Sequence, residues 1–109
     1  MHISTLTSKP YSLFFQALAN PTRMQIVHLL REKKSMNVSE ICHELELEQT
    51  HVSHSLKCLT FCGLVKSTRD GKSRLYSLNE DTSLPLLKMV DKHLESYATI
   101  LYTCDVLER

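Results

Sequence analysis

Hydrophobic residues recur three and four positions apart along most of the chain, a spacing that places them on one face of an α-helix. It predicts a first helix whose apolar face includes residues 11–18. A second helix is expected to start at Asn20 and Pro21, because asparagine caps helices well and proline is tolerated in their first turn. A third is expected to start at Asn37, three residues before Glu40, which is the spacing of a capping box.

Residues 48–63 predict a fourth helix with three different faces, because successive side chains are about 100° apart around a helix. Val52 and Leu59 lie on the apolar face, and Cys58 and Cys62 lie one turn apart on a lateral face. The remaining face is polar or basic, and its members are Gln49, Thr50, Ser53, His54 and Lys57. This helix therefore offers one face for packing, one face for a polyanion and a pair of thiols.

Two short runs follow, residues 64–69 and 73–78, and Asp70-Gly71 between them is typical of a β-hairpin turn. Basic side chains gather around this turn, namely Lys66, Arg69, Lys72 and Arg74. Such a cluster suits contact with a phosphate backbone.

A last helix is expected over residues 83–107, with a long apolar stripe and no later element to cover it. We expect this stripe to pack on the same helix of a second chain. Residues 1–8 are polar and rich in serine and threonine, and they predict a flexible arm.

The 109 residues fit a single domain, 1–109, and 42% hydrophobic residues suffice for a thin core. A net charge of +1 means that any nucleic-acid site must be a local patch. The sequence has no apolar run of membrane length and no signal-peptide pattern, so we expect a cytoplasmic protein that contacts no membrane. In that compartment its four cysteines stay reduced.

Four helices, a hairpin and a final helix make a mainly α protein with a winged helix-turn-helix fold. In this fold the second helix of the motif reads the DNA groove. Gln49 could pair with adenine, and Lys57 with phosphate or guanine. The alternative is a solvated helix face and an ordinary charged turn, and a third possibility is a winged-helix module that binds protein and never DNA. An enzyme is not indicated, because no nucleophile with a paired base and no phosphate-binding glycine loop is present.

Several motifs resemble those of ArsR/SmtB winged-helix repressors, in the order 17–23, 52–56, 63–65 and 75–78. The resemblance covers about residues 11–100. It implies a homodimer formed through the first and last helices. Such a dimer binds a pseudo-palindromic operator and leaves it when an inducer, usually a metal ion, is bound.

The family places its metal sites in several locations, and two of them lack ligands here. The third-helix cysteine pattern is replaced by Asn37 and Ser39. The last-helix site corresponds to Glu80, Thr82, His93 and Ser96. Only half of those residues could ligate, so a tetrahedral zinc site is not expected there.

The third location matches well. Residues 57–65 resemble the recognition-helix site of the CmtR-like, cadmium- and lead-sensing branch at both thiols, Cys58 and Cys62. The resemblance implies a third thiolate, Cys104, from the C-terminal region of the partner chain. Residues four apart on a helix are neighbours, and thiolates favour soft ions such as cadmium, lead, arsenite, zinc or copper(I).

Other interpretations of these cysteines remain open. Cys58 and Cys62 could be small half-buried hydrophobic residues, or the centre of a thiol redox or persulfide sensor. Cys42 is expected in the core of the third helix, and His51, beside the thiols, is a reserve ligand.

Overall fold

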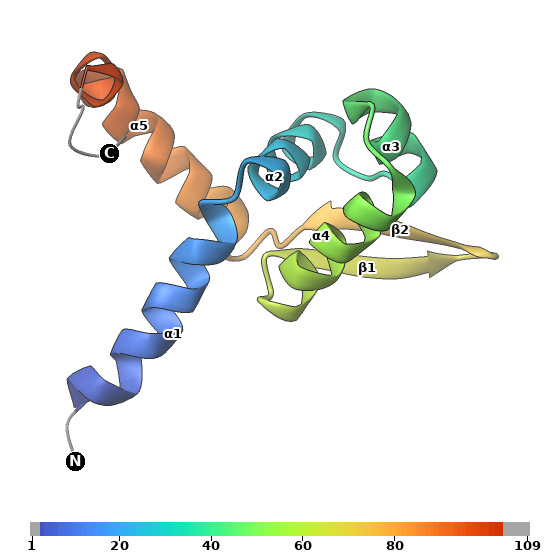
Figure 1. Cartoon of the computed structure of the whole chain (residues 1–109), viewed down its shortest axis with the longest axis horizontal. Coiled ribbons are helices and arrows are strands. Elements are labelled where there is room, and N and C mark those ends of the chain that lie inside the picture. The colour runs from blue at the N-terminus through green and yellow to red at the C-terminus, as the bar shows by residue number, and fades with distance from the viewer. Residues whose placement is uncertain (1–2, 104–109) are drawn as a thin grey trace. The chain divides into compact units, whose positions relative to one another are not determined.

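The computed structural model describes residues 3–103, with side chains from residue 8 onward (Figure 1). This part of the chain forms five helices and a two-stranded antiparallel hairpin, the predicted winged helix-turn-helix. In chain order the elements are α1 (Ile3–Leu18), α2 (Pro21–Lys33), α3 (Val38–Leu45), α4 (Gln49–Phe61), β1 (Val65–Asp70), β2 (Ser73–Leu78) and α5 (Ser83–Tyr102).

Helices α2 and α3 begin at the predicted caps. The side chain of Asn20 accepts a hydrogen bond from the backbone N–H of Arg23 at 3.0 Å, and Pro21 follows as the first helical residue. At Asn37 the capping box is complete: its Oδ1 accepts from the N–H of Glu40 at 2.8 Å, and a Glu40 carboxylate oxygen accepts from the N–H of Asn37 at 2.9 Å. Each cap contributes about 1 kcal/mol of stability.

Helix α4 begins without a side-chain cap, because Glu48 makes no such hydrogen bond. It ends at Phe61 with Cys62 as its C-cap, and the next residue, Gly63, has a φ of +78° that disfavours any residue with a Cβ atom. The N–H of Gly63 donates to Thr60 at 3.1 Å and that of Leu64 donates to Leu59 at 3.0 Å, the two bonds of a Schellman motif. The chain leaves α4 in this turn and enters β1.

The hairpin pairs Val65 with Leu78 at its base and Asp70 with Ser73 at its tip. The turn is therefore Gly71-Lys72, one residue later than Asp70-Gly71, because Asp70 still belongs to the strand pairing. Gly71 supplies the positive φ of +62° that the tight turn requires.

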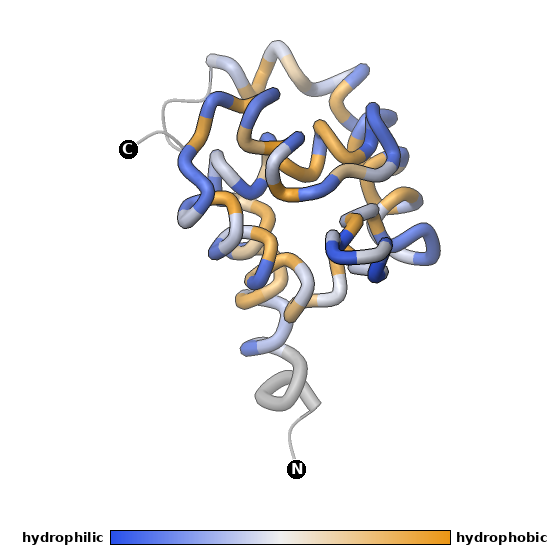
Figure 2. Tube along the Cα trace, turned by 90° about the vertical axis from the view of Figure 1, so that its right-hand side faces the viewer, coloured by the Kyte–Doolittle hydropathy of each residue, from blue (hydrophilic) through white to orange (hydrophobic). Residues whose placement is uncertain are grey.

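The core lies where the apolar faces of α2, α3 and α4 meet the base of the hairpin. Its fully buried side chains include Ile26, Leu30, Ile41, Leu56 and Leu59. Figure 2 shows hydrophobic and hydrophilic positions interspersed along the described part of the chain. Each such side chain contributes about 1.5–3 kcal/mol through burial, so the core fixes the orientation of α4.

The sequence-based boundaries of the two terminal helices need correction. Residues 3–8, expected to be part of a flexible arm, are the first turns of α1, which continues through Pro10. The lack of an N–H on proline removes one hydrogen bond but does not end this helix. Helix α5 ends at Tyr102 with Thr103 as its C-cap, and residues 104–107 of the expected 83–107 helix lie outside the described residues.

The chain divides into two compact units between Asn79 and Glu80. The second unit consists, in its described part, mainly of α5, whose large apolar side chains are widely exposed. They include Met89, Val90, Leu94, Tyr97, Ile100, Leu101 and Tyr102. In the first unit, α1 exposes Tyr11, Leu13 and Phe15 in the same way. Across residues 3–103, no helix combines the length and apolar character that a membrane span requires.

Candidate DNA-binding face and thiol site

The polar face of α4 is on the surface, as the sequence predicts. Its members, Gln49, Thr50, Ser53, His54 and Lys57, are all exposed. On the opposite face Val52 and Leu59 are completely buried. The helix is thus held by its apolar side while its polar side remains available to a partner.

One end of this polar face shares a pocket with the hairpin. The pocket has a volume of about 430 Å³ and is lined by Ser53, Lys57, Thr60, Phe61, Ser67, Arg74 and Tyr76, and we call it the hairpin pocket. It brings Lys57 of α4 and Arg74 of β2 to one concave surface. The predicted DNA-binding residues outside its walls lie nearer the start of α4 or elsewhere on the hairpin; they are Gln49, Thr50, His54, Lys66, Arg69 and Lys72.

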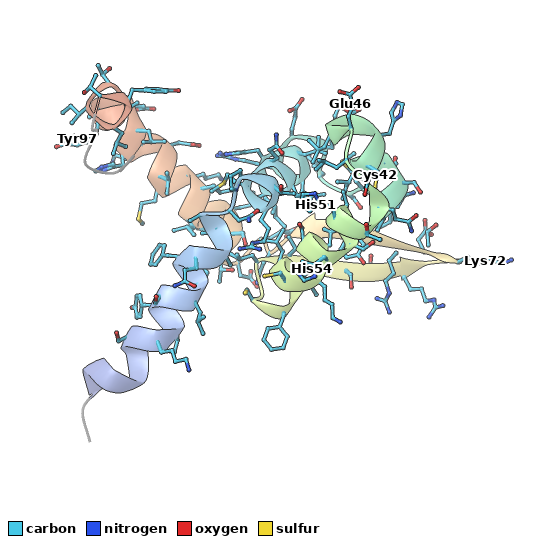
Figure 3. All side chains as sticks on the ribbon, in the orientation of Figure 1. Cys42, Glu46, His51, His54, Lys72 and Tyr97 are labelled. Atoms are coloured by element: carbon cyan, nitrogen blue, oxygen red, sulfur yellow. The ribbon has the colours of Figure 1, made fainter. Side chains whose placement is uncertain are left out.

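The hairpin concentrates positive charge. Arg69 and Arg74 are directly opposite each other in the strand pairing, although like charges in that position are destabilising. Arg74 donates a hydrogen bond from Nη1 to Oγ of Ser67 at 3.2 Å, which orients its guanidinium. Lys72 projects from the tip of the hairpin (Figure 3). A polyanion bound along the hairpin would relieve this repulsion.

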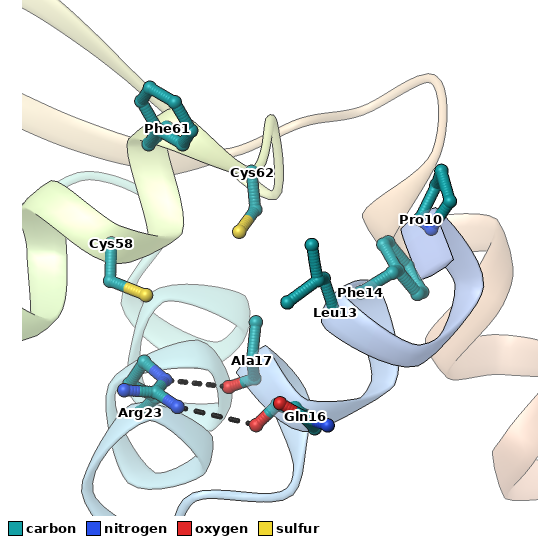
Figure 4. Close-up of a pocket in the computed structure, with 9 residues that line it drawn as sticks. All are labelled: Pro10, Leu13, Phe14, Gln16, Ala17, Arg23, Cys58, Phe61 and Cys62. Carbon is teal, nitrogen blue, oxygen red and sulfur yellow. Dashed lines mark hydrogen bonds between the residues drawn. The ribbon is translucent and has the colours of Figure 1, made fainter. Parts of the chain in front are cut away.

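Cys58 and Cys62 are half-buried on another side of α4, and both sulfur atoms point into a second pocket (Figure 4). This pocket, the thiol pocket, has a volume of about 460 Å³. It is lined by Pro10, Leu13, Phe14, Gln16, Ala17, Arg23, Cys58, Phe61 and Cys62. Because most of these residues belong to α1, any ligand of the thiols would also contact α1.

Arg23 closes one side of the thiol pocket (Figure 4). Its Nε donates to the backbone oxygen of Ala17 at 2.7 Å and its Nη2 to that of Gln16 at 3.2 Å. These carbonyls belong to the last turn of α1, where helical partners are lacking. Arg23 therefore joins the end of α1 to α2. Sequence reasoning missed this role, because the two elements meet only in the fold.

The thiol of Cys62 has a raised pKa. Burial is the largest cause, followed by the charge of Cys58 and a hydrogen bond with the Cys58 side chain, while Arg23 acts in the opposite direction. Cys62 is therefore held in its protonated form over a wider pH range than a free cysteine. A metal ion would have to displace that proton, so binding there would release protons.

Among the other candidate residues, His51 and Cys42 do not line the thiol pocket. Cys104 lies outside the described residues. His51 is exposed on α4 and does not line the pocket, and Cys42 is half-buried on α3 rather than fully in the core. Within residues 8–103, no cluster of three or more histidine, cysteine or acidic side chains could hold a metal ion. The described residues thus supply two thiols to the site.

Comparison with known proteins places the chain in a family. Residues 20–67 match the model of the bacterial regulatory protein, arsR family. This match runs from the cap of α2 into the hairpin, and it includes α4 with both thiols.

Individual relatives are similar in sequence over most of the chain. An HTH-type transcriptional regulator of Methanocaldococcus jannaschii is 37% identical over 78 residues, which cover 72% of this chain and 88% of the relative. A probable mercury resistance operon repressor of Streptomyces lividans is 38% identical over 68 residues, or 62% of this chain. That match covers 53% of the Streptomyces protein, so this chain corresponds to about half of it.

A solved structure confirms the fold. The homodimeric winged helix-turn-helix domain of a Mycobacterium bovis protein, a possible ArsR-family regulator, superposes with a TM-score of 0.79 at 24% identity. The match covers 89% of each chain. The relatives are transcriptional regulators rather than enzymes, in agreement with the sequence-based prediction. The chain therefore belongs to the ArsR/SmtB family of winged helix-turn-helix transcriptional repressors.

Proposed function

We propose that this protein is a metal-responsive repressor of the CmtR-like type, which binds operator DNA as a homodimer and releases it when a thiophilic ion binds Cys58 and Cys62. The single observation that carries the proposal is that one helix, α4, bears both the exposed polar face and the two thiols. An ion bound to the thiols would act directly on the helix that reads DNA.

The DNA-binding half rests on α4 and the hairpin. The polar face of α4 enters the major groove, where Gln49 can pair with adenine and Ser53 with a base or phosphate. Lys57 and Arg74, on the walls of the hairpin pocket, contact the sugar–phosphate backbone. The other contacts are Thr50, His54, Lys66, Arg69 and Lys72. Two copies of this arrangement would read two half-sites one helical turn apart.

The homodimer would cover the exposed apolar side chains of α1 and α5. Tyr11 is 64% exposed and Tyr102 is 86% exposed, and large apolar residues of this kind gather on interfaces. The Mycobacterium bovis domain is homodimeric with the same fold, which supports this assembly. We expect the protein in the cytoplasm, where operator DNA and reduced thiols occur together.

The donor set suits a soft ion. Cys58 and Cys62 would hold it, and Cys104 of the partner chain is the expected third ligand. Sulfur ligands select thiophilic ions such as cadmium, lead, arsenite or zinc. The mercury resistance repressor among the relatives supports a soft metal as inducer, without deciding which one.

Release follows from coupling between two sites. An ion that joins α4 of one chain to the C-terminal segment of the other would fix α4 in an orientation that no longer fits the operator. Because coupling is reciprocal, DNA must weaken ion binding by the same factor. A typical coupling free energy of about 1–3 kcal/mol corresponds to roughly 5- to 150-fold in DNA affinity.

Fluorescence anisotropy with a labelled fragment of the protein's own promoter tests the proposal. Cadmium should lower the operator affinity of the wild type by a factor within that range. Cys58→Ser should bind the operator as the wild type does and lose the response, whereas Cys42→Ser, outside the pocket, should keep it. A retained response in Cys58→Ser would refute the assignment of the site.

Thiol redox or persulfide sensing is the alternative signal, and it is favoured by the two thiols that line one pocket, one turn apart on α4. Oxidation begins from the thiolate, and the raised pKa of Cys62 works against it. Residues four apart on a helix are also poorly oriented for a disulfide. An ultraviolet thiolate-to-cadmium band that appears together with DNA release would favour the metal, and release by a persulfide donor alone would favour redox sensing.

A further inference from the structure

We propose that Glu48 is a specificity-determining residue of the DNA-binding face, and that its carboxylate accepts a hydrogen bond from the N4 amino group of a cytosine in the major groove. The inference rests on the proposed DNA-binding function of α4 and adds a residue and a base to it. Its basis is a carboxylate that does not cap its own helix and that directly precedes the exposed residues Gln49 and Thr50.

The turn between α3 and α4 fixes the backbone of Glu48 at the start of α4. Glu46 ends α3 in the left-handed conformation, with a φ of +53°, and its N–H donates to the backbone oxygen of Cys42. The N–H of Leu47 donates to the same oxygen at 3.1 Å. The backbone oxygen of Glu48 then accepts from the N–H of Val52 at 3.0 Å, as the first hydrogen bond of α4. Glu48 therefore has a defined position next to the polar face of α4.

The side chain of Glu48 is not used by the helix that it precedes. Asn20 and Asn37 cap α2 and α3 through their side chains, whereas Glu48 makes no side-chain cap hydrogen bond. Glutamate is also not among the residues preferred at this position. Its side chain is exposed. In helix-turn-helix proteins the N-terminal residues of the recognition helix contact base edges, so this carboxylate is placed to reach a base.

The charge around the turn makes proximity to phosphate unfavourable for Glu48. Residues 35–56 contain Glu40, Glu44, Glu46 and Glu48 and no lysine or arginine. The first lysine that follows is Lys57, near the other end of α4. A carboxylate brought against DNA is repelled by the phosphates and loses water, and both effects cost free energy unless a base donates a hydrogen bond to it.

Cytosine is the base that suits this acceptor best. Its major-groove edge presents the N4 amino donor, whereas guanine presents two acceptors, and thymine presents an acceptor and a methyl group. Adenine presents a donor beside an acceptor, an edge that matches an amide such as that of Gln49 better than a carboxylate. Repulsion from the acceptors of guanine and thymine adds to the discrimination, because specificity also comes from penalties on wrong partners.

The test uses the full-length protein and a library of random-sequence duplexes, from which the wild type, Glu48→Ala and Glu46→Ala each select binding sites. Fluorescence anisotropy then measures their affinities for the duplex that the wild type selects and for its single-base-pair variants. Glu46→Ala is the matched control, because it removes the same charge from the same turn at an exposed position. We expect the wild type to require cytosine at one position of each half-site, where another base weakens binding by about fivefold or more. Glu48→Ala should lose this preference at that position alone, and Glu46→Ala should keep it.

A cytosine preference retained in Glu48→Ala would overturn the inference. Its loss in Glu46→Ala would do the same, because general repulsion would then explain the effect. If Glu48→Ala weakens binding to every duplex equally, the residue acts only on the structure of α4 and the inference is wrong. In these three cases the proposed DNA binding stands. If the wild type selects no sequence at all, the proposed DNA binding fails together with the inference.

Discussion

Two pockets flank α4, and they differ in the chemistry of their walls rather than in size. The hairpin pocket has about 430 Å³ and the thiol pocket about 460 Å³. The first is lined mainly by hydroxyl and basic side chains, including Lys57 and Arg74. The second is lined mainly by apolar side chains and the two thiols. One helix thus separates a surface suited to phosphate from a surface suited to a soft, weakly hydrated ligand.

Phe61 is the residue that the two pockets share. It lines both, and it is 93% exposed at the end of α4. A ligand in the thiol pocket and DNA at the hairpin pocket could therefore both contact this ring. This arrangement gives a short physical route for coupling between inducer and operator, which needs no long chain of intermediate residues.

The largest effect is expected from a substitution on the buried face of α4, because the packing of this face holds the walls of both pockets in place. Leu59 is completely buried, and Leu59→Ala should lower the free energy of unfolding by about 2–5 kcal/mol through lost burial and a cavity. Urea unfolding measures this loss. Phe61→Ala, on the exposed side, should stay within about 0.5 kcal/mol of the wild type. Similar losses of unfolding free energy for the two variants would mean that α4 is not held in the fold by the face that carries Leu59.

A second experiment tests whether the two pockets have different functions, and it does so by removing positive charge from the hairpin pocket alone. Lys57→Ala with Arg74→Ala should weaken operator binding by about tenfold at physiological salt and reduce the slope of log affinity against log salt by about 2. Anisotropy at several salt concentrations measures both. Cadmium affinity should stay unchanged, because neither side chain lines the thiol pocket.

Lys92→Ala, on α5, removes a cation outside both pockets and serves as the control. It should leave the salt dependence near that of the wild type. An unchanged slope in the double variant would show that the hairpin pocket does not contact phosphate, and the comparison between the two pockets would lose its functional meaning.

Local sequence signals predicted the parts of this architecture that depend on neighbouring residues. Asn20 and Asn37 cap α2 and α3 because their side chains reach amides three residues ahead. Gly63 ends α4 because only glycine adopts its φ without strain. The faces of α4 follow from helical periodicity, which also identified Cys58 and Cys62 as a pair.

The features that sequence reasoning predicted wrongly or missed depend mostly on contacts between distant residues. The first turns of α1 have no strong local signal, and the polar, serine- and threonine-rich composition of residues 1–8 predicted a flexible arm where the helix already runs from Ile3. The contacts of Arg23 with Gln16 and Ala17 could not be predicted, because a helix C-terminus and a side chain of the next helix meet only after folding. For the same reason the sequence indicated two thiols but not the apolar wall opposite them.

The smallest expected effect concerns the thiols themselves. Cys58 raises the pKa of Cys62 through its charge and its hydrogen bond, so Cys58→Ala should lower that pKa and increase the thiolate fraction of Cys62. Iodoacetamide reacts with the thiolate, and its rate at Cys62 near pH 8 should rise by about twofold, because burial, the larger cause, remains. Mass spectrometry of the alkylated peptide measures the rate. At high pH the two proteins should react equally, since Cys62 is then ionised in both. Cys42→Ser should leave the rate unchanged, and a slower reaction in Cys58→Ala would show that the two thiols do not interact across the turn of α4.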